Sequence, residues 1–148
     1  MRNFTTIDDI LLFALESENQ SIEFYSRLAE FATEEETKKM FLDLMREEVC
    51  HVKKLEYFLS NKDELELSKL DIDLSSIKYL PHVSPAADVT IDECLLIAIQ
   101  KERAAINLYT DLAREATTQT MIDLFQMLAF EETKHALLFE NRYQAAKK

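Results

Sequence analysis

Apolar residues recur at alternating spacings of four and three along four stretches of the chain, which is the spacing of one face of an α-helix. The pattern predicts helices at about 7–32, 34–60, 91–116 and 118–145. Thr6, Thr33 and Thr90 each precede an acidic residue by three positions, as in helix-capping boxes. Only one or two residues separate the first helix from the second and the third from the fourth. Each pair is therefore expected to form an antiparallel hairpin.

The two predicted hairpins repeat one another. A shift of 84 positions aligns residues 6–56 with 90–140 without a gap, and nineteen of these 51 positions are identical. Shared helical periodicity explains several of the apolar matches, but it does not explain the polar ones. The polar identities include the pairs Glu18/Glu102, Tyr25/Tyr109, Glu47/Glu131, Glu48/Glu132 and His51/His135. The sequence therefore predicts a duplicated helical hairpin.

The predicted fold is all-α, an antiparallel four-helix bundle in one domain that covers residues 1–148. It consists of a hairpin at 6–60, a crossover connection at 61–89 and a second hairpin at 90–146. The crossover contains both prolines of the chain, Pro81 and Pro85, and one short helix is expected near 62–70. A crossover of this length reaches along a helix of about 26 residues, which rises about 39 Å.

A glutamate interrupts the apolar face of every predicted helix, and in the second and fourth helices a histidine follows it by three residues on the same face. These residues are Glu18, Glu48, His51, Glu102, Glu132 and His135. Unpaired buried carboxylates are costly, and the same faces offer no Lys or Arg. Two divalent cations would balance the four negative charges. Oxygen and imidazole ligands suit iron, manganese or zinc. We therefore predict a two-metal site, with iron as the leading candidate.

Tyr25 and Tyr109 lie seven residues after Glu18 and Glu102, on the same helix faces. Each tyrosine is either a packed core residue or a candidate catalytic residue whose hydroxyl orients a ligand carboxylate. Methionines fall at helical spacing, as core residues do, so no haem is expected.

Composition narrows the function classes. The net charge of −11 argues against binding to nucleic acid or to an anionic membrane, and the absence of glycine argues against a sheet protein. The N-terminal residues lack the apolar stretch of a signal peptide, and no run is long enough to span a membrane, so we expect a cytoplasmic protein. Cys50 and Cys94 form no Cys-x-x-Cys pair.

The motifs Glu18-x6-Tyr25, Glu48-x2-His51, Glu102-x6-Tyr109 and Glu132-x2-His135 resemble those of the rubrerythrin branch of the ferritin-like superfamily. The resemblance covers essentially the whole chain. It implies that Glu48 and Glu132 bridge two irons, that Glu18 and Glu102 are terminal ligands, and that each histidine binds one iron. It also implies reduction of hydrogen peroxide with electrons from a rubredoxin-type centre.

The sequence departs from that family pattern in two places. It lacks the two Cys-x-x-Cys pairs of a rubredoxin domain, so an external donor such as a rubredoxin-like protein is expected. Ala105, with its repeat mate Ser21, stands where peroxide-specialised members resemble one another in having an additional glutamate. The ligand set is therefore closer to that of bacterioferritin-like centres.

Three functional hypotheses follow. The first is a di-iron oxidoreductase that reacts with hydrogen peroxide or O2. The second is an iron-binding or storage protein of ferroxidase type, and the third is a structural bundle with a vestigial or zinc-filled site. A homodimer is expected, and because the crossover is long, exchange of hairpins between subunits remains an alternative.

Overall fold

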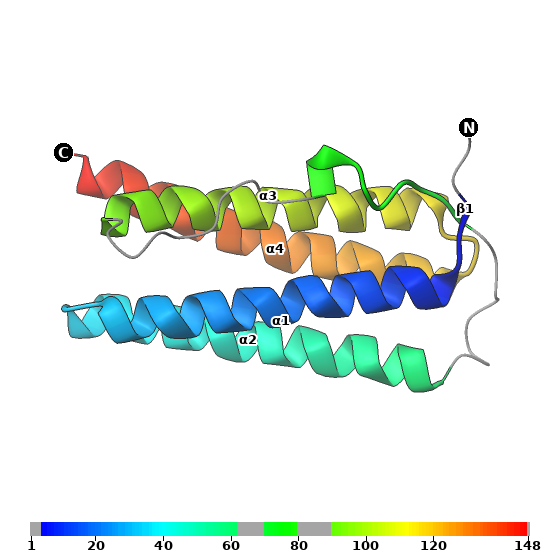
Figure 1. Ribbon diagram of the computed structural model, residues 1–148, viewed down its shortest axis with the longest axis horizontal. Helices are drawn as coiled ribbons and strands as arrows, with labels where there is room; N and C mark the ends of the chain where they lie inside the picture. Colours follow the sequence, from blue (N-terminus) through cyan, green and yellow to red (C-terminus); the bar gives the residue numbers. More distant parts are fainter. Residues whose placement is uncertain (1–3, 62–69, 80–89, 148) are drawn as a thin grey trace. The chain divides into compact units, whose positions relative to one another are not determined.

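The computed structural model describes residues 4–61, 70–79 and 90–147. Its four helices are α1 (Ile7–Phe31), α2 (Glu35–Ser60), α3 (Ile91–Glu115) and α4 (Gln119–Ala146). Each begins and ends within one residue of its predicted bounds. The chain forms two compact units, residues 1–71 and 72–148, and each unit contains one antiparallel helical hairpin (Figure 1). The duplicated hairpins predicted from the sequence are therefore confirmed.

Threonine caps fix the starts of three helices. The side-chain oxygens of Thr6 and Thr90 each accept a hydrogen bond of 3.2 Å from the backbone N–H three residues later. Thr118 does the same for α4, at 3.3 Å. The predicted cap at Thr33 is wrong, because α2 begins one residue later than expected and its N-cap is Glu34, which makes no side-chain capping bond. A cap acts only from the residue directly before the helix.

The apolar identities of the repeat are core positions in both units. The pairs Leu11/Leu95, Ala14/Ala98, Leu28/Leu112, Phe41/Phe125 and Leu44/Leu128 are all buried. The duplication therefore preserves the packing surface of the hairpin as well as its polar motifs.

Two short strands, one before α1 and one in the predicted crossover, were not revealed by the sequence pattern. Strand β1 (Phe4–Thr5) pairs antiparallel with β2 (Leu70–Asp71) in the first unit. A short helix was predicted near 62–70. This prediction is wrong at Leu70, which belongs to strand β2. The other residues of the predicted helix lie outside the described part of the chain. Both prolines also lie outside it.

A 3-10 turn, η2 (Ile77–Tyr79), is anchored on α3 in the second unit. The buried Tyr79 hydroxyl donates a 2.6 Å hydrogen bond to Asp111, and the Lys78 ammonium lies 2.7 Å from the same carboxylate. The Asn107 amide donates a 3.1 Å bond to the Lys78 carbonyl. Position 27 in the first hairpin, which corresponds to Asp111, is an arginine, so this anchor belongs to the second hairpin alone.

Candidate metal centre

The six predicted metal ligands lie in the interior of the protein. Among the described residues, they are the complete set of polar or charged side chains that are buried, and their exposed fractions are between 0% and 3%. No lysine or arginine in the described ranges is buried with them. The prediction that helix-face glutamates and histidines point inward is therefore confirmed, while their role as ligands stays a prediction.

In the first unit, α1 contributes Glu18 and α2 contributes Glu48 and His51. One ligand atom from each of these residues lies within 4.8 Å of the others. The His51 Nδ1 atom is 3.6 Å from a Glu18 oxygen and 3.3 Å from a Glu48 oxygen. The three-residue spacing on α2 places the glutamate and the histidine on one side of the helix, where both face Glu18.

The second unit repeats this arrangement. Glu102 on α3 meets Glu132 and His135 on α4, again with one ligand atom from each within 4.8 Å of the others. The His135 Nδ1 atom is 3.7 Å from a Glu102 oxygen and 3.6 Å from a Glu132 oxygen. We call each Glu–Glu–His group a half-site. The sequence repeat is thus matched in the positions of the side chains.

These distances fit a shared cation. Two oxygen or nitrogen atoms bound to one metal ion at about 2.1 Å, separated by 90–110°, lie roughly 3.0–3.4 Å apart. The nitrogen–oxygen separations of 3.3–3.7 Å in the half-sites are close to that range. The donor set of two carboxylates and one imidazole also matches iron, manganese or zinc. Either half-site could therefore hold one such ion.

The electrostatics of the first half-site also call for a cation. The pKa of Glu18 is raised from about 4.5 to about 8, chiefly by burial and also by the neighbouring Glu48, while His51 acts in the opposite direction. Two carboxylates this close together are stable only when a proton or another positive charge accompanies them. A metal ion that replaces the proton would remove this penalty.

Tyr25 and Tyr109 are fully buried and make equivalent ring contacts. Tyr25 stacks on Phe41 with ring centroids 6.5 Å apart, and Tyr109 stacks on Phe125 at 6.3 Å. Both phenylalanines belong to the second helix of their hairpin and are themselves a repeated pair. The packing role of the two tyrosine rings is therefore clear, and a role for their hydroxyls beside the ligands stays a prediction.

The repeated acids Glu47 and Glu131 lie nearer the surface than the half-site residues. Glu131 forms a 3.0 Å ion pair with Lys134, and Glu47 is exposed. Cys50 is exposed, Cys94 is buried, and neither forms a disulfide.

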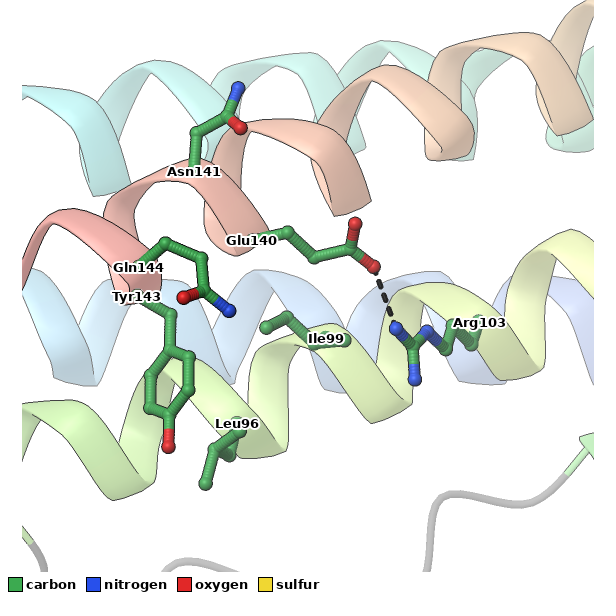
Figure 2. A pocket seen from close by; sticks show the side chains of 7 residues that line it. All are labelled: Leu96, Ile99, Arg103, Glu140, Asn141, Tyr143 and Gln144. Carbon is green, nitrogen blue, oxygen red and sulfur yellow. Dashed lines mark hydrogen bonds and ion pairs between the residues drawn. The ribbon is translucent and has the colours of Figure 1, made fainter. Parts of the chain in front are cut away.

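A surface hollow of about 430 Å³ lies between α3 and α4, and no half-site residue lines it (Figure 2). The residues that line it are Leu96, Ile99, Arg103, Glu140, Asn141, Tyr143 and Gln144. A 2.7 Å ion pair between Arg103 and Glu140 crosses from one helix to the other, as the dashed line in Figure 2 shows. Both partners are substantially exposed, and ion pairs of this kind contribute little to stability.

Comparison with solved structures defines the class of this fold. A crystal structure assigned to a ferritin-like diiron-carboxylate protein of Thermotoga maritima matches with a TM-score of 0.81, over 99% of this chain and 99% of that chain, at 24% sequence identity. The protein therefore has the ferritin-like fold, and the predicted all-α four-helix bundle is confirmed.

The sequence profile of the rubrerythrin family matches residues 9–92 and, separately, residues 93–148. The chain belongs to the rubrerythrin family. The second match starts at the beginning of α3, in keeping with the internal repeat. A search of curated proteins gave no match. In the described ranges, none of the helices has the length and apolar character that a membrane span requires.

The raised pKa of Glu18 predicts a pH dependence of stability for the metal-free protein. In the unfolded chain this carboxyl ionises near pH 4.5, whereas in the folded chain it keeps its proton up to about pH 8. The folded state should therefore lose stability as the pH rises between these values. Thermal unfolding with a chelator at several pH values between about 5 and 8 measures this slope.

The matched variant for that measurement is Glu18→Gln, which cannot ionise. Its melting temperature should fall less steeply with pH than that of the wild type. Asp43, an exposed acid whose pKa is lowered by Lys39, provides the control variant Asp43→Asn, which should keep the wild-type slope over this range. Equal slopes for the wild type and Glu18→Gln would contradict the assignment.

Proposed function

We propose that the two half-sites together form one di-iron centre, and that the protein is an oxidoreductase that reduces hydrogen peroxide or reacts with O2. The observation that carries this proposal is the duplicated Glu–Glu–His group, buried in each hairpin without a lysine or arginine. Membership of the rubrerythrin family and the ferritin-like fold support it. In this proposal Glu48 and Glu132 bridge the two irons, and Glu18 and Glu102 are terminal ligands. His51 and His135 bind one iron each.

The chemistry divides between the metal and the protein. Two bound iron(II) ions would supply the two electrons that reduce the peroxide, and the external donor would return the resulting iron(III) to iron(II). The side chains hold the ions in fixed positions, exclude bulk water and balance the charge. Reduction of one hydrogen peroxide to two waters consumes two electrons and two protons. We propose that a rubredoxin-like protein or another external donor supplies the electrons.

A second candidate function is uptake and storage of iron through a ferroxidase-type reaction. The residue types at two positions favour it. Ala105 and Ser21, each three residues beyond a predicted terminal ligand, offer no carboxylate, whereas peroxide-specialised rubrerythrins resemble one another in having an additional glutamate at the helix α3 position. Both residues are only partly buried.

Stopped-flow absorption spectroscopy distinguishes the two candidates. The iron(II)-loaded protein is mixed with hydrogen peroxide in the presence of rubredoxin and its reductase. We expect many peroxide molecules to be reduced per chain, with no iron(III) bound beyond two ions per chain. Accumulation of iron(III) well above two ions per chain would favour storage. Neither peroxide turnover nor iron uptake would contradict both candidates.

The ligand assignment predicts that Glu48→Gln loses metal while its neighbour variant Glu47→Gln does not. Each variant removes one negative charge, and the two positions are consecutive in α2. Glu48 is fully buried, whereas Glu47 is exposed. We expect Glu48→Gln to bind iron(II) at least about tenfold more weakly. Elemental analysis and calorimetric titration measure the content and the affinity.

Circular dichroism of the metal-free Glu48→Gln protein provides the folding control. Removal of a buried charge should leave helix content unchanged, so that weaker binding reflects the lost ligand. Full metal content at wild-type affinity in Glu48→Gln would remove Glu48 from the ligand set. The same pair of changes at Glu132 and Glu131 tests the second half-site.

The proposed role of the tyrosine hydroxyls is tested by Tyr25→Phe and Tyr109→Phe. Phenylalanine keeps the ring packed on Phe41 or Phe125 but removes the hydroxyl. If the hydroxyls orient ligand carboxylates, peroxide turnover should fall about tenfold and the absorption spectrum of the iron(III) protein should shift, with two irons still bound. Tyr57→Phe, at an exposed position, is the control. Unchanged turnover and spectrum would leave the tyrosines as packing residues.

A further inference from the structure

Helix α4 carries large apolar side chains on its exposed surface. Phe130 is 63% exposed, Leu137 is 53% exposed and Leu138 is 41% exposed. Phe130 and Leu137 are seven residues apart and therefore lie on one side of the helix. Lys134 lies between them, with its ammonium 5.2 Å from the centre of the Phe130 ring. We call these four residues, Phe130, Lys134, Leu137 and Leu138, the α4 outer face.

The duplicated hairpin provides an internal reference for this face. The positions in α2 that correspond to Phe130, Leu137 and Leu138 are occupied by Arg46, Lys53 and Lys54, which are all exposed. Helices α2 and α4 carry the same Glu-x-x-His motif and bury equivalent core positions. They differ in that α2 presents cations to water at three places where α4 presents apolar groups. Large apolar side chains exposed together on one helix are typical of interaction sites.

The α4 outer face is complementary to a second copy of itself. When two α4 helices pack antiparallel about a two-fold axis that passes between residues 133 and 134, Phe130 of each copy lies opposite Leu137 of the other. Glu131 and Lys134 flank the apolar residues on the same side of the helix. In this arrangement Lys134 of one copy lies within reach of Glu131 of the other, so that each carboxylate meets an ammonium. Such local pairing matters in a chain whose net charge of −11 opposes self-association.

We propose that the α4 outer face is the contact surface of a symmetric homodimer in which two α4 helices pack antiparallel. This contact lies on the side of α4 opposite to Glu132 and His135. Around the helix axis, Glu132 is turned about 200° from Phe130 and His135 about 140°. The dimer therefore forms without covering the half-site residues of α4. Its formation is independent of the reaction that the metal centre carries out.

The decisive variant transfers the residues of the first hairpin to the second: Phe130→Arg, Leu137→Lys and Leu138→Lys. Sedimentation velocity of the full chain, at concentrations from about 1 to about 100 µM, should show a dimer for the wild type and a monomer for this variant. Phe31→Glu is the control, because Phe31 is 73% exposed on α1 and its repeat mate is Glu115. This control should remain dimeric.

Circular dichroism and iron content of the triple variant should match those of the wild type. If the triple variant does not fold, the single change Leu137→Lys is measured in its place, and it should weaken dimerisation at least about tenfold. A wild type that is monomeric over the whole range would overturn the proposal. So would a folded variant that stays associated.

Cysteine cross-linking tests the antiparallel geometry. In a Cys50→Ser background, which removes the exposed native thiol, Thr133→Cys places a thiol beside the proposed axis. Mild oxidation should join two such chains by a disulfide. Gln126→Cys lies one heptad earlier, where the two antiparallel copies would be about 20 Å apart, and should not cross-link. Efficient cross-linking through position 126 would instead indicate parallel helices and contradict the proposed dimer.

Discussion

The structure depends on one electrostatic constraint: each hairpin buries two carboxylates and an imidazole in an apolar interior. Without a positive charge this arrangement is unfavourable, as the pKa of Glu18, raised to about 8, indicates. The helices supply the rigidity that such a site needs, because Glu48 and His51 are fixed on one face by the helical turn. A bound cation would convert a destabilising cluster into a stabilising one, so metal binding and folding stability should be linked.

The duplication explains why each hairpin contains an equivalent Glu–Glu–His half-site. The identical pairs of the repeat include buried core positions, the predicted ligands, and the two tyrosines that each stack on a phenylalanine. These are the residues that a Glu–Glu–His half-site and its packing require. Where the copies differ, the second hairpin has features that the first lacks. Asp111 replaces Arg27 and anchors the segment that ends at Tyr79, and Phe130 replaces Arg46 on the outer side of α4. The differences between the copies are therefore as informative as the identities.

The ferritin-like fold and membership of the rubrerythrin family limit the chemistry without selecting one reaction. The proposed ligand set suits both reduction of peroxide and oxidation of iron(II). The balance between these reactions depends on small features close to the ligands, such as the missing carboxylate at Ala105 and the proposed orienting role of Tyr25. The helices supply a common scaffold, and the chemistry is set by the few side chains that surround it.

The sequence alone determined the helices to within one residue and the six buried polar side chains, because both follow from local periodicity and from a repeat that needs no gap. The sequence did not predict the pairing of β1 with β2, the start of α2 after Thr33, or the bond from Tyr79 to Asp111. The strand pairing and the Tyr79–Asp111 bond depend on contacts between residues distant in the chain. The cap of α2 depends on the residue at which the helix begins. The exposure of Phe130 and Leu137 was likewise decided by the tertiary structure, because periodicity identifies an apolar side chain but cannot say whether a neighbouring helix covers it.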